Sequence, residues 1–378
     1  METRVSRMTT DSRATTRAAR IPELDLLRFA AAIAVVLYHF TYRPVVGGQI
    51  NETIAGGLQA VTRFGYLGVP LFFLLSGFVI LWSSEHRSPG EFVASRIARL
   101  YPSFWTCALL TALVLAWAGH PASGPALAAN LTMAPSLFGI SYLDGVYWTL
   151  FVEAKFYVVI FVILLSGTMP AIERWLMGWL AVCIVCATGR APHVLGSLAL
   201  APFGPYFISG ALCFLMRSRG VSGLRVAALC VSCALAVATA LSRQPDFITG
   251  HAYGVGGTST IVVAVAIVVF HVALVVIALR PPMLRHARAW YLLGSLTYPL
   301  YLAHNQIGKV LAAPLEETAS FGVSLALRLA IVIGVATIIA FFTERRACGA
   351  VQRALFRARR RVLAYRTDPA HSAAGGVQ

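Results

Sequence analysis

The chain has 378 residues, of which 58% are hydrophobic and 12% are charged, and its formal net charge is +16. Soluble domains carry about 25% charged residues, so this composition excludes a soluble globular protein and indicates a membrane protein. The basic surplus could suit nucleic acid, but its placement argues against that partner. Arginines gather in both terminal segments and in alternate loops between apolar runs, which is the positive-inside pattern of membrane topology.

Apolar runs of roughly 17–25 residues can cross a bilayer as helices. The sequence therefore predicts an all-α, polytopic membrane protein with about ten transmembrane helices in one bundle and both termini cytoplasmic. The predicted spans are 27–46, 64–82, 100–118, 146–165, 173–188, 196–216, 224–241, 258–279, 290–310 and 321–342.

The predicted organisation is a basic cytoplasmic tail (1–24), one membrane domain (25–343) and a second basic cytoplasmic tail (344–378). The arginine-rich start followed by an apolar run also resembles a secretory signal. That run ends in Tyr38, His39 and Phe40 without a small-residue cleavage site, so we expect an uncleaved first span.

The first span, LDLLRFAAAIAVVLYHF, contains an arginine and a histidine. Arg28 and His39 are 11 positions apart, which places them on one helix face and roughly 16 Å apart along the axis. Ionisable residues in hydrocarbon are costly, so each is a functional hypothesis by default. The pair predicts a polar path through part of the bilayer.

The fourth span begins YWTLFVEAKFY. Trp148 suits the aromatic belt at the outer membrane interface. Glu153 lies roughly 8 Å deeper, Tyr157 is its i+4 neighbour, and Lys155 points elsewhere. A buried glutamate is expected to be protonated or to pair with another helix, and a purely structural Glu–Arg or Glu–Lys pair remains an alternative.

In the second span, FGYLGVPLFFLLSGFVILW, the small residues around Ser76 and Gly77 interrupt a phenylalanine-rich helix. Gly68, Pro70 and Gly77 permit a bend or a close approach of helices. A nucleophilic Ser76 would need a neighbouring base and an oxyanion donor, neither of which the sequence shows, so helix packing is the favoured interpretation.

The third span opens with RIARLYPSFW, which places Arg96 and Arg99 three residues apart at the predicted inner surface. Two guanidinium groups beside a helix N-terminus suit a phosphate or pyrophosphate. Positive-inside anchoring explains the same residues equally well.

The ninth span, LLGSLTYPLYLAHNQIG, contains Pro299, which is expected to weaken or kink the helix. Tyr301 and His304 are i,i+3 neighbours on it. His304, His39 and Glu153 all fall in the predicted outer half of the membrane. Three titratable residues from three helices at similar depth are the best physical sign of a site.

Other polar residues of the spans receive structural interpretations. His271 predicts a packing or interhelix hydrogen-bond role, and Arg328 is expected to extend toward the membrane interface. The pairs Cys183/Cys186 and Cys230/Cys233 lie in apolar helices without flanking charges or histidine, so we expect helix packing and no metal.

Five of these segments, in this order, resemble the acyltransferase-3 family of bacterial integral-membrane acyltransferases: LDLLRFAAAIAVVLYH, FFLLSGFVI, RIARLYP, YWTLFVEAKFY and LTYPLYLAH. The resemblance covers nearly the whole membrane domain. It implies that Arg28 and His39 are functionally required, and it maps Arg96 and Arg99 onto the family's Arg-x-x-Arg. Its tryptophan–glutamate–tyrosine stretch corresponds to Trp148, Glu153 and Tyr157.

The resemblance implies an acyl-CoA donor, usually acetyl-CoA, no permanently bound cofactor, and a hydroxyl acceptor on a cell-envelope or secreted glycan or a glycosylated product. His39, Arg28 and Glu153 are the candidate catalytic residues, and Arg96 and Arg99 the candidate donor-binding residues. His39 is expected to act as general base, with a covalent acyl-histidine as the less favoured alternative. The candidate supporting residues are Trp148, Tyr157, Ser76, Tyr301 and His304.

This interpretation places the protein in the bacterial cytoplasmic (inner) membrane. Ala154 and Lys155 stand where the family often has an acidic residue or glutamine, a departure that could tune the acceptor. A secondary transporter or flippase for a glycan or small polar solute is the main alternative, because the Gly/Pro-containing segment APFGPYFISG suits a discontinuous helix. A non-enzymatic scaffold in envelope assembly is the third possibility. The acceptor, acyl length and oligomeric state stay open.

Overall fold

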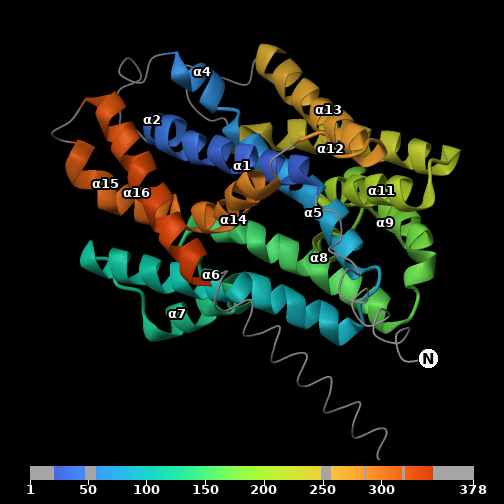
Figure 1. Cartoon of the computed structure of the whole chain (residues 1–378), viewed down its shortest axis with the longest axis horizontal. Helices are drawn as coiled ribbons and strands as arrows, with labels where there is room; N and C mark the ends of the chain where they lie inside the picture. The colour runs from blue at the N-terminus through green and yellow to red at the C-terminus, as the bar shows by residue number, and fades with distance from the viewer. Residues whose placement is uncertain (1–20, 47–56, 248–256, 285–286, 317–319, 344–378) are drawn as a thin grey trace, which may run out of the picture.

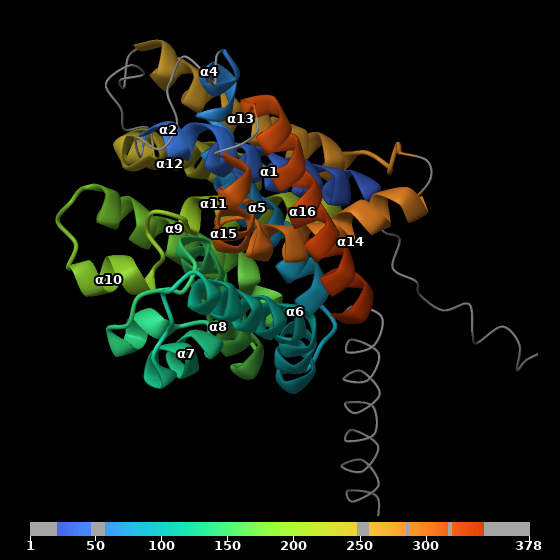
Figure 2. The same ribbon diagram turned by 90° about the vertical axis from the view of Figure 1, so that its left-hand side faces the viewer.

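The computed structural model describes residues 21–46, 57–247, 257–284, 287–316 and 320–343, and within them all regular structure is helical. The two basic tails, 1–20 and 344–378, lie outside the described residues. Figures 1 and 2 show α1 (Pro22–Leu37), α5 (Gly68–Ser84) and α14 (Ala287–Ala303) between a layer with α12 (Gly223–Phe247) and α13 (Gly257–Leu279) and a layer with α6 (Pro89–Trp117) and α8 (Trp148–Leu165).

The other described elements surround this centre. They are the π-helical turn η2 (Tyr38–Tyr42), α2 (Arg43–Val46), α4 (Leu58–Thr62), η3 (Gly65–Leu67), α7 (Gly124–Leu131), η4 (Pro135–Phe138), η5 (Gly145–Tyr147), η6 (Met169–Ala171), α9 (Ile172–Ala187), α10 (His193–Leu198), α11 (Gly204–Arg219), α15 (Gln306–Glu316) and α16 (Phe321–Phe342).

The prediction of an all-α polytopic membrane protein is confirmed. Eight helical segments of the described residues are long and apolar enough to cross a membrane: Pro22–Tyr42, Leu58–Ser84, Pro89–Trp117, Gly145–Leu165, Met169–Ala187, Gly223–Arg243, Ser259–Leu279 and Phe321–Phe342. The predicted sixth and ninth spans contain the shorter helices α11 and α14, of 16 and 17 residues.

Glycines allow the central helices to approach closely. A Cβ atom added at Gly77 of α5 would lie 2.2 Å from the carbonyl oxygen of Phe207 on α11, and one added at Gly210 of α11 would lie 2.0 Å from that of Leu74. Gly68 faces the Ala31 carbonyl of α1 in the same way, at 2.5 Å. Of the two expectations for these small residues, the structure shows close helix packing, as small-residue contacts in membrane bundles permit.

α1 begins at Pro22, five residues before the predicted start, because proline and the acidic first-turn residues Glu23 and Asp25 favour a helix N-terminus. The Glu23 carboxylate accepts hydrogen bonds from the backbone N–H groups of Met283 and Leu284, at 2.5 and 2.8 Å. This contact places the start of α1 beside the segment that leads into α14.

α14 runs parallel to α1, and the continuation into α15 keeps that contact. Gly294 lies against Asp25, and Gly308, on α15, lies against the ring of Phe40. Pro299 is accommodated inside α14. The helix is interrupted five residues later, at His304 and Asn305, so the predicted span 290–310 is divided between α14 and α15, and the break follows His304 instead of lying at Pro299. The parallel arrangement carries His304 to the level of His39.

Two polar residues of the spans are buried inside the bundle. His271 on α13 bonds through Nδ1 to the Ile267 carbonyl (2.8 Å) and through Nε2 to Ser209 Oγ on α11 (3.1 Å), the interhelix role expected from sequence. Arg328 is only 3% exposed, and its guanidinium lies 6.0 Å from the centre of the Phe40 ring. The expectation that Arg328 extends to the membrane interface is therefore wrong.

We predict that Gly77→Ala destabilises the bundle by about 1–3 kcal/mol, because the added methyl group overpacks the contact between α5 and α11. Gly334→Ala on α16 is the matched control, since a Cβ there meets no atom within 4 Å and alanine favours helix. Thermal unfolding of the detergent-solubilised protein measures both. Equal melting temperatures for the two variants would contradict the proposed close approach.

Candidate functional site

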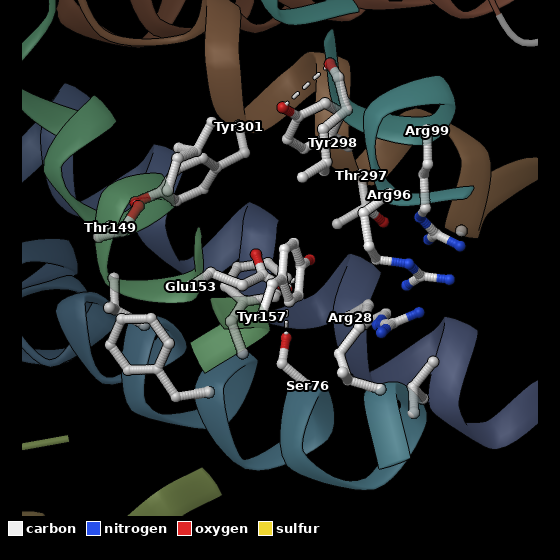
Figure 3. A pocket seen from close by; sticks show the side chains of 18 residues that line it. Arg28, Ser76, Arg96, Arg99, Thr149, Glu153, Tyr157, Thr297, Tyr298 and Tyr301 are labelled. Atoms are coloured by element: carbon white, nitrogen blue, oxygen red, sulfur yellow. Dashed lines mark hydrogen bonds between the residues drawn. The ribbon is translucent and has the colours of Figure 1, made fainter. Parts of the chain in front are cut away.

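A pocket of about 810 Å³, part of it open to solvent, lies among α1, α5, α6, α8 and α14. Figure 3 shows the arginines at one end of it, Thr149 and Tyr301 at the other, and Glu153, Tyr157 and Ser76 between them. It is lined by Arg28, Val69, Phe72, Phe73, Ser76, Val79, Ile80, Arg96, Arg99, Leu100, Thr149, Leu150, Glu153, Tyr157, Gly294, Thr297, Tyr298 and Tyr301.

The guanidinium groups of Arg28, Arg96 and Arg99 gather at one end of the pocket (Figure 3). α6 begins at Pro89, so Arg96 and Arg99 lie two to three turns inside it, and the expectation of a helix N-terminus beside them is wrong. Arg96 is buried, and its guanidinium lies 5.7 Å from the ring centre of Phe92 and 6.0 Å from that of Tyr157. The start of α6 is fixed by a capping box between Ser88 and Glu91. Three neighbouring cations that are partly shielded from water form a site suited to a ligand with several negative charges.

Glu153 is bound by two hydroxyl groups inside the pocket. Its Oε1 atom accepts hydrogen bonds from Ser76 Oγ on α5 (2.8 Å) and from Tyr157 OH one turn along α8 (2.6 Å). Lys155 points elsewhere, as predicted, with its Nζ near Ser197 and the ring of Phe151. Glu153 therefore pairs with another helix through a neutral hydroxyl, and Ser76 uses its proton in that bond.

His39 and His304 meet directly. His304 Nε2 lies 3.3 Å from His39 Nδ1, and the ring centres are 4.9 Å apart. His39 lies in the π-helical turn η2, which widens the end of α1, and such turns are frequent at functional sites. The prediction that these two histidines come together is consistent with this contact.

The hydrogen bonds of the two rings define which nitrogens carry hydrogen. His39 Nδ1 contacts the carbonyl oxygen of Val35 (2.9 Å), and His304 Nδ1 contacts that of Tyr301 (2.7 Å). A carbonyl oxygen only accepts, so each Nδ1 is the donor of its ring. In the neutral pair, the single Nδ1–H of His39 is shared between the Val35 carbonyl and His304 Nε2, so the Nε2 atom of His39 carries the lone pair that can accept a proton.

The sequence grouped Glu153 with His39 and His304 by their similar depth, but the structure separates Glu153 from the two histidines. Glu153 lines the pocket with the arginines, whereas neither His39 nor His304 is among the residues that line it. Tyr301 connects the two places: it lines the pocket, its ring packs 5.6 Å from that of His304, and its hydroxyl bonds to Thr149 Oγ1 at 2.9 Å.

Trp148 lies apart from the arginine pocket. It lines a second, mainly apolar cavity with Tyr66, Phe203, Tyr206 and Arg243, and its ring packs 5.4 Å from that of Phe203. The expected supporting role of Trp148 would therefore be exercised from this neighbouring cavity.

Sequence reasoning missed Asp144, which is completely buried. Its carboxylate accepts from Val146 N (3.1 Å), Asn305 Nδ2 (2.6 Å) and Gln306 N (2.8 Å). In sequence it is an ordinary Asp–Gly pair before a span, which predicts a turn. Only the return of the chain at α14 and α15 reveals its contacts.

Together, the helices and the pocket define a multi-pass membrane protein with a polybasic pocket inside its bundle. Residues 21–345 match the family described as Acyltransferase domain, and the chain belongs to this family, the acyltransferase-3 family that its motifs resemble. The protein is thus a multi-pass membrane member of this family.

The chain is also similar to a curated protein, "Acyltransferase MdmB" from Streptomyces mycarofaciens, with 33% identity over 100 residues. That match covers 26% of this chain and 25% of the relative. No solved structure matches the chain.

Proposed function

We propose that this acyltransferase takes an acetyl group from cytoplasmic acetyl-CoA and transfers it to a hydroxyl group of a cell-envelope or secreted glycan, or of a glycosylated product. Its location in this proposal is the bacterial cytoplasmic membrane. The observation that carries the donor assignment is the gathering of Arg28, Arg96 and Arg99 at one end of a pocket inside an acyltransferase domain.

The arginine end suits the phosphates of CoA. Guanidinium groups bind phosphate oxygens through paired, charge-assisted hydrogen bonds. Arg28 lies in the second turn of α1, and Arg96 and Arg99 lie in the first half of α6. The arginine distribution predicts that both helices start on the cytoplasmic side, where CoA is found. The acyl-bearing arm would then extend past Ser76 and Glu153 toward Tyr301.

His39 is the proposed general base. Its Nε2 lone pair takes the proton of the acceptor hydroxyl as the oxygen attacks the thioester carbonyl. The C–S bond then breaks, the CoA sulfur leaves as a thiolate, and the proton on His39 Nε2 passes to that sulfur, which restores the neutral base. An imidazole suits proton transfer near neutral pH. Because Tyr301 separates the pocket from His304 and His39, its side chain must move for the thioester to reach His39.

The direct test follows radiolabelled acetyl-CoA with the purified protein in lipid nanodiscs and an extract of glycans and glycosylated products from the producing cells. Label is expected in an extracted acceptor, with the mass increment of one acetyl group. Movement of a glycan across vesicle membranes without consumption of acetyl-CoA would instead support the transporter alternative and reject the proposal.

Arg99→Ala is expected to weaken acetyl-CoA binding by on the order of 10-fold or more, because a hydrogen bond to a charged group contributes about 1.5–3 kcal/mol. Arg280→Ala, an exposed arginine outside the pocket, is the control. Calorimetric titration with acetyl-CoA measures both. An unchanged dissociation constant for Arg99→Ala would reject the phosphate-binding role.

His39→Ala is expected to lower acetyl transfer by about 10²–10⁴-fold, the usual contribution of a positioned base, while acetyl-CoA affinity and membrane levels stay normal. His193→Ala, which removes an exposed histidine of α10, should keep full activity. Turnover by His39→Ala at the rate of the control would exclude His39 as the base.

A further inference from the structure

The interruption between α14 and α15 is held by one buried carboxylate. Asp144 receives the Asn305 side-chain amide and the Gln306 backbone N–H, while its remaining bond goes to Val146 at the start of η5. The loop before α8 is thus tied to the two residues that follow His304. Without this carboxylate, the Gln306 N–H and the Asn305 amide would lose their acceptor in a buried site, which costs free energy.

The position of His304 matters because of what it does to His39. The His39 Nδ1–H bonds toward His304 Nε2 and the Val35 carbonyl, so this nitrogen is occupied and the proton of an acceptor must go to His39 Nε2. His304 therefore has the place that an orienting acceptor has beside a catalytic histidine. A shift of His304 would loosen the ring of His39.

The charges around the two rings make the carboxylate more important. Lys309 acts electrostatically on both rings and Arg43 on His39, whereas the negative charge of Asp144 acts on His304. Nearby cations disfavour protonation of a histidine unless a negative charge offsets them. Among the residues that the structure describes, the titratable and charged groups facing the pair are Tyr38, Arg43, Asp144, Tyr301 and Lys309.

We propose that Asp144 is a positioning residue of the acyl transfer reaction. Its carboxylate fixes the His304–Gln306 turn so that His304 Nε2 stays within reach of His39 Nδ1–H, and its charge offsets the positive charge that the histidine pair gains when His39 Nε2 takes the acceptor proton. This role rests on the proposed function, in which His39 is the base.

Asp144→Asn tests the role, because asparagine has the same shape and lacks the charge. Acetyl transfer is expected to fall on the order of 10- to 100-fold, the usual effect of losing an orienting partner behind a functional histidine, with the KM for acetyl-CoA unchanged. Loss of the negative charge disfavours the protonated rings, so the acid limb of the pH–rate profile should move to lower pH.

Asn130→Ala is the matched structural control. Asn130 is buried and holds the same loop through Ser141 O and Leu143 N, but it is uncharged. This variant should lower the melting temperature without moving the acid limb. A wild-type rate and pH profile for Asp144→Asn, or an equal pH shift for Asn130→Ala, would show that Asp144 only holds the loop.

The double variant Asp144→Asn/Asn305→Asp covers the case in which the single variant does not fold. The exchange keeps one amide and one carboxylate in contact and leaves the charge next to His304. It is expected to fold and to keep the acid limb near its wild-type position. A folded double variant with no transfer at any pH, beside an active Asn130→Ala, would overturn the charge-based role.

A readout independent of turnover separates failure of this inference from failure of the proposed function. NMR titration of isotopically labelled histidine, with the His39 signals assigned by their loss in His39→Gln, follows the rings directly. In Asp144→Asn the titration midpoint of the pair should move to lower pH. An unchanged titration midpoint in Asp144→Asn would contradict the electrostatic role of Asp144, even if the protein transfers acetyl groups normally. A shifted midpoint in a protein that transfers no acetyl group would support the electrostatic contact and reject the proposed function.

Discussion

The cost of placing charge inside a membrane bundle governs this structure. Arginine in hydrocarbon is expensive, so it persists only beside a cavity, a partner or the interface. Arg28 and Arg96 satisfy that constraint because both line a pocket that is partly open to solvent. Glycines bring α5 close to α11 and α1, and side chains of α5, α6, α8 and α14 form the walls of the pocket.

The backbone departs from regular helix near the two histidines, and the departures are buried in protein. The π-helical turn η2 contains His39, and the interruption after Ala303 contains His304. Irregular backbone at membrane depth is tolerated only where other groups satisfy its N–H and C=O atoms. Asp144 supplies that satisfaction at Gln306, so the same carboxylate makes the interruption possible and fixes the histidine beside it.

The sequence predicted the helical class, and it singled out polar residues that the structure places in the pocket or in the histidine pair, because apolar length and buried charge are local properties that can be read from one segment. It predicted less well which residues meet. Arg28 and His39 share a helix face, yet their separation along α1 puts one at the arginine end of the pocket and the other beyond Tyr301. Glu153 was associated with His39 from depth alone, but depth does not determine which helices are neighbours.

Asp144 illustrates a different limit. Its structural role depends on a contact with Asn305, which lies 161 positions further along the chain. Nothing in the local sequence distinguishes it from any aspartate that starts a turn. The position of the interruption in the ninth span was mispredicted for a related reason. Pro299 is the local feature that suggests an interruption, whereas the observed one begins at His304, where Asp144 from another loop accepts a hydrogen bond from the Gln306 backbone N–H.

Separation of the arginine pocket from the histidine pair has a chemical consequence for an acyltransferase. A thioester beside an unhindered general base and water would be hydrolysed, and exclusion of water from the reacting centre is a known means of preventing that loss. The Tyr301 ring and its hydroxyl bond to Thr149 stand between the two places. In the proposed reaction, the acceptor displaces this contact before the thioester meets His39. The base is then available only when an alcohol is present to use it, and the barrier between the two places couples the two substrates.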